Sequence, residues 1–164
     1  MGIQQNTDRI LTTHIGSLPR PHHVLDLMKA KLGGQPYDQK VYAAAITKAV
    51  EDSVRKQVEC GIDIVTDGEV SKPGFFTYIQ ERIDGFEARP GQKMKIFEKE
   101  VAAFPEYYEQ YFKQAMMGGT IVPITPVVCV GPVKYRGEAA LKVDIDNLKA
   151  AARSAGVPDH HVFL

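Results

Sequence analysis

The clearest signal of the fold of this chain lies at residues 55–69, RKQVECGIDIVTDGE. It begins inside a helical pattern that ends at Gly61, and residues 62–66 then form an apolar, β-branched run. A run of this kind, bounded by Gly61 and Gly68, is typical of a buried strand. A long helix that leads directly into a buried strand indicates a layered α/β architecture.

The helix before this strand is predicted to begin after Asp38, which can accept hydrogen bonds from the first free backbone N–H groups. Apolar residues then recur at every fourth position, which predicts one buried face. These residues are Tyr42, Ile46, Val50, Val54 and Val58.

Other apolar runs predict three more strands, at residues 10–15, 127–130 and 161–164. Further helical patterns lie at residues 22–32, 73–83, 104–112 and 141–156. We therefore expect about four parallel strands that alternate with helices, with an excursion at about residues 86–120.

The length of the chain limits the fold that these elements can build. A complete (β/α)8 barrel takes about 250 residues, and this chain has 164. We expect an incomplete (β/α)8 TIM barrel, a half-barrel whose bare sheet edge is covered by a second copy or by a missing carboxyl-terminal half. The alternative is a small open doubly wound sheet. The apolar end at residues 162–164 disfavours it, because such a strand needs cover.

The composition excludes several classes of partner. Twenty Lys and Arg residues balance twenty Asp and Glu residues, so nucleic acid is not an expected partner. The polar amino-terminal residues contain no targeting or membrane segment, and we expect a cytoplasmic protein. Cys60 and Cys129 lack the spacing of a metal site, so we expect buried, reduced thiols.

Polar side chains follow the first two predicted strands. Residues 12–20, TTHIGSLPR, bring a His, a Ser and an Arg to the carboxyl end of the first strand, and Asp67 and Glu69 follow the second. Sites in parallel α/β folds open at this edge. Carboxylates there can bind an ammonium group, accept a proton or hold a cation, but they also suit solvated turns. Spacing alone leaves both interpretations open, and Lys134 and Tyr135 after the third strand are weaker candidates.

Three motifs in this order resemble the cobalamin-independent methionine synthase superfamily, in particular its short one-barrel members. They are TTHIGSLPRP at residues 12–21, RKQVECGIDIVTDGE at 55–69 and VGPVKYRGEAALKVDIDNLKAAARSAGV at 130–157. The superfamily also contains epoxyalkane:coenzyme M transferases, and its members are eight-stranded barrels. The resemblance implies that this chain is the amino-terminal half of such a barrel.

The resemblance also implies a reaction, the zinc-assisted transfer of a methyl group from 5-methyltetrahydropteroylglutamate to the thiol of homocysteine. Zinc lowers the pKa of the thiol, and the thiolate attacks the methyl carbon. By similarity, Ile15 and Ser17 hold the amino-acid end of homocysteine and Glu69 takes its ammonium group, with His14 and Asp67 beside them. A carboxylate at this place repels the sulfonate of coenzyme M by about 1 to 4 kcal/mol at 4 Å.

Members of the superfamily bind zinc through His and Cys residues on later strands, and neither cysteine of this chain matches such a ligand. The chain by itself is therefore expected to hold no catalytic zinc and to turn over no substrate. One alternative is a non-catalytic binding or assembly module that forms a homo-oligomer. Another is half of a coenzyme M-type thiol alkyltransferase.

Overall fold

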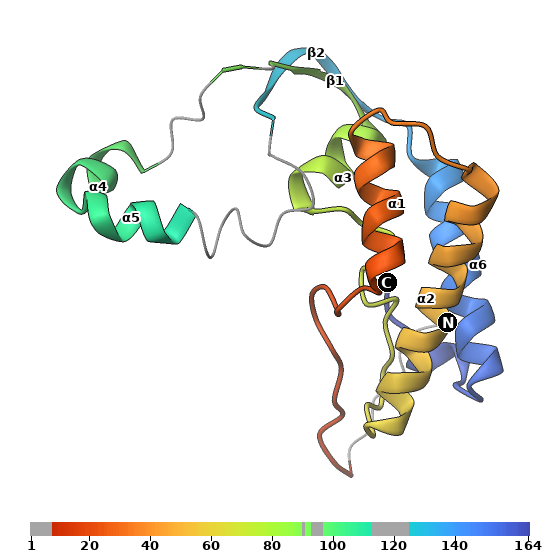
Figure 1. Cartoon of the computed structure of the whole chain (residues 1–164). Coiled ribbons are helices and arrows are strands. Elements are labelled where there is room, and N and C mark those ends of the chain that lie inside the picture. Colours follow the sequence, from red (N-terminus) through yellow and green to blue (C-terminus); the bar gives the residue numbers. More distant parts are fainter. Residues whose placement is uncertain (1–7, 90, 93–96, 113–124) are drawn as a thin grey trace. The chain divides into compact units, whose positions relative to one another are not determined.

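The computed structural model describes residues 8–89, 91–92, 97–112 and 125–164. The chain divides into two units, whose helices and strands are shown in Figure 1. Unit 1 comprises Met1–Lys72 and Glu138–Leu164, and unit 2 comprises Pro73–Gly137.

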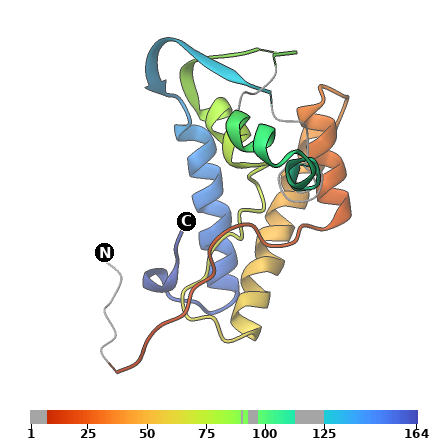
Figure 2. The same cartoon turned by 90° about the vertical axis from the view of Figure 1, so that its left-hand side faces the viewer.

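Unit 1 is built on three helices, α1 (His22–Leu32), α2 (Gln39–Glu59) and α6 (Glu138–Ser154). Helix α2 packs against both α1 and α6, and Figures 1 and 2 show α2 and α6 side by side. Removal of apolar surface from water holds these elements together. The largest fully buried side chains are Met28, Leu148, Val24, Val54, Val65 and Val70.

The buried face of α2 differs from the expected stripe at one end. Ile46, Val50 and Val54 are at most 5% exposed, whereas Val58 is 37% exposed and Gln57 only 4%. A step of four residues exceeds one 3.6-residue turn by about 40°, so a stripe at every fourth position drifts around the helix. At the end of α2 the drift turns Val58 outward, and Gln57 takes the inward position.

Segments from three of the four expected strands meet in unit 1, but only through single bridges. Thr13 pairs with Ile64 and Val65 pairs with Val162, and both pairings are parallel. The strand expected at residues 161–164 does not form: Val162 makes a single bridge, and His161 belongs to the short 3-10 helix η2 (Asp159–His161).

The expected half-barrel of four parallel strands is not what the described residues form. Their one sheet lies in unit 2 and is an antiparallel pair of β1 (Ile83–Ala88) and β2 (Val127–Tyr135). Strand β2 is also largely exposed, although the sequence predicts a buried strand at residues 127–130. An apolar run favours a strand, but its partner and direction depend on pairing with distant residues.

Strand β2 also continues through the place where the sequence predicts a loop. The register of the pair shifts at Gly85, which has a φ of +92°, and a Cβ there would lie 2.7 Å from the carbonyl oxygen of Pro132. The register shift is a bulge or similar irregularity, at which β2 has more residues than β1 and yet does not end. Lys134 and Tyr135 therefore belong to β2, and the prediction that they lie in a loop after the third strand is wrong.

The prediction of buried cysteines is wrong as well. Cys60 and Cys129 are both exposed and both are free thiols. Cys60 is the C-cap residue of α2, beyond the last buried turn, and Cys129 lies in the exposed strand β2.

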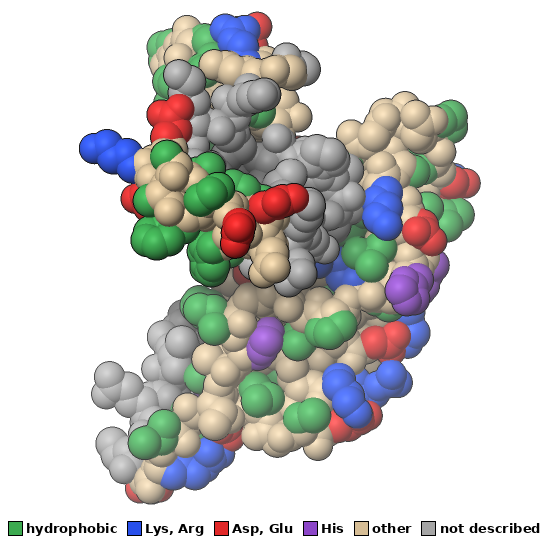
Figure 3. Space-filling view, turned by 60° about the vertical axis from the view of Figure 1, so that its left-hand side comes forward, with side chains coloured by type: hydrophobic (Ala, Val, Ile, Leu, Met, Phe, Trp, Pro, Cys, Tyr) green, Lys and Arg blue, Asp and Glu red, His purple; other side chains and the backbone are tan. Residues whose placement is uncertain are grey.

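In the described residues of unit 2 the helices are α3 (Phe75–Arg82), α4 (Glu98–Ala103) and α5 (Pro105–Tyr111). The aromatic helix expected at residues 104–112 corresponds to α5, whose rings pack mainly on one another, as Tyr107 does on Tyr111 with centroids 6.0 Å apart. Tyr107 is still 62% exposed, and Figure 3 shows hydrophobic side chains at the surface. Residues 90, 93–96 and 113–120 of the expected excursion lie outside the described residues.

No helix in the described residues combines the length and the apolar character that crossing a membrane requires.

An ion pair between Arg9 and Asp63 joins residues 9–13 to residues 62–65 in unit 1. The guanidinium of Arg9 donates to both carboxylate oxygens of Asp63, and the backbone N–H of Thr12 donates to Oδ2 at 2.8 Å. These hydrogen bonds hold the pKa of the Asp63 carboxyl well below its ordinary value, and the hydrogen bond from Arg9 has the largest effect. Asp63 thus aligns the two segments just before their parallel bridge.

The drift of the α2 stripe predicts that two valines one turn apart differ in their contribution to stability. Val54→Ala should lower the free energy of unfolding by about 2 kcal/mol, because it removes two buried methyl groups and leaves a cavity. Val58→Ala is the matched control and should lower it by less than about 0.5 kcal/mol. Urea denaturation followed by circular dichroism measures both, and equal losses would contradict the drift.

The Asp63 ion pair predicts a pH dependence. Since the pKa of Asp63 is lower in the folded than in the unfolded chain, its contribution is present above about pH 5 and is lost as the pH falls toward the folded pKa. Asp63→Asn should therefore lower the melting temperature at pH 7 and flatten its decline below pH 5. Melting curves between pH 7 and pH 3 test this, and an unchanged acid slope would show that Asp63 has no such role.

Candidate functional site

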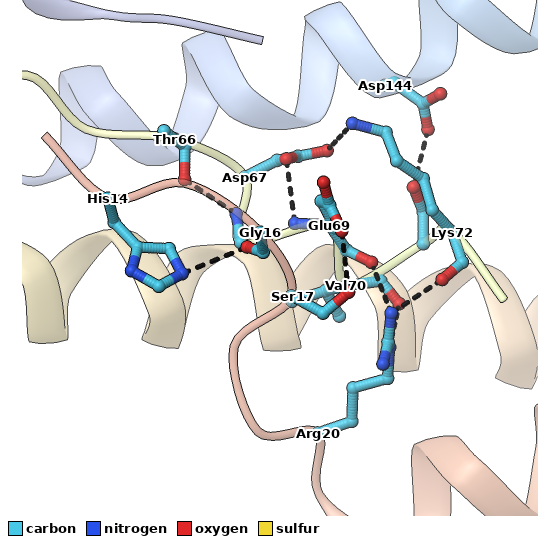
Figure 4. Close-up of polar contacts among 12 residues, drawn as sticks. His14, Gly16, Ser17, Arg20, Thr66, Asp67, Glu69, Val70, Lys72 and Asp144 are labelled. Atoms are coloured by element: carbon cyan, nitrogen blue, oxygen red, sulfur yellow. Dashed lines mark hydrogen bonds and ion pairs between the residues drawn. The ribbon is translucent and has the colours of Figure 1, made fainter. Parts of the chain in front are cut away.

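Two loops of unit 1 lie against each other where the parallel bridge ends. Loop A, residues 14–20, follows Thr13, and loop B, residues 66–72, follows the segment of Ile64 and Val65. The backbone N–H of Leu18 in loop A donates to the carbonyl of Gly68 in loop B at 2.9 Å. Loops A and B are therefore in direct contact, and Figure 4 shows their polar contacts.

Gly68 brings loop B into close contact with α2 and with loop A. Its φ is +61°, and an added Cβ would lie 2.5 Å from Oγ of Ser53 on α2 and 3.0 Å from a methyl carbon of Leu18. Only glycine combines a positive φ with the absence of a Cβ at no cost in strain. Any side chain there would collide with Ser53 and Leu18, and the left-handed region costs other L residues free energy. The glycine between the two acids of the motif therefore sets the position of loop B.

Helix α2 supports loop B through a buried amide. Nε2 of Gln57 donates to the carbonyl of Thr66 at 2.8 Å, and Oε1 of Gln57 accepts from the backbone N–H of Thr66 at 3.0 Å. Both residues are buried, so these bonds satisfy polar groups that would otherwise be costly in an apolar interior. Oγ1 of Thr66 then accepts from the backbone N–H of Gly68 at 3.1 Å, which extends the support to the turn.

Ser17 and Glu69 face each other across the two loops. Oγ of Ser17 donates to Oε2 of Glu69 at 2.6 Å (Figure 4). Ser17 is exposed and Glu69 is half-buried, so a ligand from solvent can reach the pair. Glu69 has a φ of 53°, which is uncommon for a residue other than glycine.

Asp67 has a different environment from Glu69, although the two acids are only two positions apart. Its side chain is 4% exposed, Oδ1 accepts from the backbone N–H of Glu69 at 2.9 Å, and Oδ2 lies 3.0 Å from Nζ of Lys72. The ion pair offsets the cost of burying the carboxylate. Asp67 therefore acts within loop B, where it orients the backbone of Glu69.

The other predicted site residues lie beside this pair. Nε2 of His14 is 3.0 Å from the carbonyl oxygen of Gly16, and the ring is half-buried. The side chain of Ile15 is 88% exposed. The hydrogen bond of His14 lies within loop A, and the roles that the resemblance implies for His14 and Ile15 remain predictions.

Arg20 connects loop A to the backbone of loop B. Its Nη2 donates to the carbonyls of Glu69 at 2.7 Å and Lys72 at 2.6 Å, and its Nε donates to that of Val70 at 3.1 Å. Burial lowers the pKa of the Arg20 guanidinium, while the charges of Glu69 and Asp67 act in the opposite direction.

Two residues that support loop B are not among those predicted from the sequence. One is Gln57, and the other is Asp144 on α6, which is buried and accepts a hydrogen bond from Oγ of Ser71 in loop B at 3.0 Å. Each interrupts an apolar helical stripe, since Asp144 lies one turn before Leu148. A polar residue at a core position of a helix is a detectable signal of a buried hydrogen bond.

The described residues do not fit a zinc site. No three side chains of His, Cys, Asp or Glu within them gather in a way that could hold a metal ion. A zinc ion at a protein site takes three or four such ligands. No metal-dependent step is therefore assigned to these residues.

A family comparison matches the larger part of the chain. The sequence model described as "Cobalamin-independent synthase, Catalytic domain" matches residues 10–134. This range includes both loops and the supporting helix α2.

Curated relatives match about half of the chain. The chain is 36% identical over 75 residues to a methionine synthase of Sulfolobus acidocaldarius, a match that covers 46% of this chain and 22% of the relative. It is 34% identical over 79 residues to a 5-methyltetrahydropteroyltriglutamate–homocysteine methyltransferase of Acidiphilium cryptum, covering 46% and 10%. The chain is 31% identical over 84 residues to the enzyme of that name in Thermosynechococcus vestitus, covering 51% and 11%. The matches thus span from about a tenth to about a fifth of the length of these relatives.

The packing of Gly68 predicts a contrast with a second glycine of the site. Gly68→Ala should lower the free energy of unfolding by about 3 kcal/mol, from both backbone strain and steric overlap. Gly16→Ala is the matched control, because Gly16 has a φ of +91° but open space around its Cβ position, and should cost only about 1 kcal/mol. Urea denaturation measures both variants, and equal costs would show that the close approach at Gly68 is not a constraint.

Proposed function

This chain belongs to the family of cobalamin-independent synthase catalytic domains, and on that premise we propose that loops A and B bind the amino-acid end of homocysteine. The observation that carries the proposal is the pairing of the Ser17 hydroxyl with the Glu69 carboxylate at 2.6 Å. Support at the family level comes from the names of the relatives, which are methionine synthases and homocysteine methyltransferases.

The chemistry of this pair suits an ammonium group. An ammonium group carries three donors, a carboxylate only accepts, and a hydroxyl can donate one hydrogen bond while it accepts another. Ser17 can therefore keep its bond to Glu69 and accept from the ammonium group, while Glu69 accepts a second hydrogen bond. The positive charge of the ligand would make the hydrogen bond to Glu69 charge-assisted.

The charges of loop B favour this ligand over an anionic thiol. The carboxylate of Asp67 is paired with Lys72, and Arg20 is bonded to backbone carbonyls. The carboxylate of Glu69 is thus the acidic group that faces the exposed Ser17. A sulfonate at this place would be repelled by about 1 to 4 kcal/mol at 4 Å, which disfavours a coenzyme M-type thiol.

In the proposed reaction a methyl group moves from a methyltetrahydrofolate-type donor to the sulfur of homocysteine. The described residues contribute binding and orientation of the amino-acid end, and the activation of sulfur is not assigned to them. Holding one end of the thiol substrate reduces the freedom that the reaction must otherwise remove, which is how positioning contributes to rate. His14, Ile15 and Asp67 are proposed as neighbours of the bound ligand, with Asp67 acting through the backbone of Glu69.

The proposal predicts a selective effect of Glu69→Gln, which keeps the size of the side chain and removes its charge. Binding of L-homocysteine should weaken at least tenfold, or about 1.4 kcal/mol. Binding of 4-mercaptobutanoate, which lacks the amino group, should change less than about twofold, because Glu69 has no ammonium to contact. Isothermal titration calorimetry in a reducing buffer measures both.

The matched control is Glu59→Gln, at an exposed glutamate on the last turn of α2. It should leave both affinities unchanged. Equal loss of the two ligands in Glu69→Gln, or no loss of either, would contradict the proposed role of Glu69.

A further inference from the structure

Glu69 has a backbone conformation that needs support. Gly68 and Glu69 follow each other with φ values of 61° and 53°. Glycine adopts this region freely, but for glutamate it costs on the order of 1 kcal/mol. The conformation therefore persists only where surrounding contacts hold it, and it determines where the carboxylate points.

Three backbone contacts hold this turn from within loop B. The N–H of Glu69 donates to Asp67, the carbonyl of Glu69 accepts from the N–H of Lys72 at 3.0 Å, and the N–H of Val70 donates to the carbonyl of Asp67 at 3.4 Å. A carbonyl oxygen has two lone pairs. The second acceptor position of the Glu69 carbonyl is used by Arg20 at 2.7 Å.

Arg20 reaches the backbone of loop B from loop A. Its guanidinium bonds the carbonyls of Glu69, Val70 and Lys72, as Figure 4 shows, while its backbone lies three residues after Ser17. Arg20 thus constrains both members of the Ser17–Glu69 pair. It fixes the peptide plane after Glu69 and the distance of loop A from that plane.

An arginine fits this position better than a lysine would. A residue that served only to balance the charges of Asp67 and Glu69 could be lysine. Three carbonyls bonded by Nε and Nη2 need donors in a planar fork, which the single nitrogen of lysine does not supply. Partial burial of a guanidinium among neutral carbonyls also carries a cost in lost hydration, which the three hydrogen bonds offset.

We infer that Arg20 is a positioning residue, which holds the backbone of Glu69 so that its carboxylate stands beside Ser17 to receive the ammonium group of the ligand. The inference rests on the proposed function of loops A and B. Arg20 acts through Glu69 and does not itself contact the ligand. Its contribution to binding therefore depends on the charge of Glu69.

A double-mutant cycle tests this dependence on the full chain, with L-homocysteine as the probe in isothermal titration calorimetry. Arg20→Lys should weaken binding about tenfold in the chain with Glu69, because the charge remains but the fork is lost. In the Glu69→Gln background the same substitution should weaken binding less than twofold, since there is no carboxylate left to position. Additive losses in the two backgrounds would mean a merely structural role and would overturn the inference.

Two further variants keep the result decisive. Arg20→Gln removes the charge but keeps an amide donor, and it should also weaken binding of L-homocysteine. It replaces Arg20→Lys in the cycle if the lysine variant does not melt cooperatively. Arg9→Lys is the matched control, since Arg9 bonds Asp63 outside both loops, and it should bind as the unmodified chain does. Normal binding by Arg20→Lys would also overturn the inference.

The outcomes separate the two proposals. If the unmodified chain does not bind L-homocysteine, or if Glu69→Gln binds equally well, the proposed function fails. If both of those tests succeed and Arg20→Lys still binds normally, the proposed function stands and only the positioning role of Arg20 is rejected.

Discussion

The close approach of Gly68 to Leu18 and Ser53 is the constraint on which the candidate site depends. Because Gly68 has no Cβ, loop B can lie in contact with α2 on one side and with loop A on the other. The hydrogen bond from Leu18 to Gly68 then brings their chain neighbours, Ser17 and Glu69, face to face. A pair built on backbone contacts keeps its geometry better than two long side chains that meet only in solvent.

Buried polar groups transmit this constraint to the helices of unit 1. Gln57 on α2 bonds both backbone groups of Thr66, and Asp144 on α6 accepts from Ser71. In an apolar interior each of these groups would be costly without its partner, so the packing of the helices and the conformation of loop B depend on each other. The site is therefore carried by the core and not by a loose surface turn.

The same packing separates the roles of two neighbouring acids. Asp67 is buried, paired with Lys72 and bonded to the backbone of Glu69, whereas Glu69 is half-buried and reaches the exposed Ser17. From the residue types alone, either acid could bind an ammonium group or hold a cation. Burial and partners assign Asp67 to the support of the loop and leave Glu69 as the group best placed for a ligand.

Short-range signals predicted the local elements of unit 1, because glycines, an N-cap aspartate and helical periodicity act over a few residues: α2 begins after Asp38 and ends before Gly61, as expected. Tertiary contacts were needed to establish the antiparallel pairing of β2, the exposure of both cysteines, and the contacts of Gln57 and Arg20. These features join residues far apart in the chain or in different elements. Their energies come from burial and pairing in three dimensions, which short-range patterns do not encode.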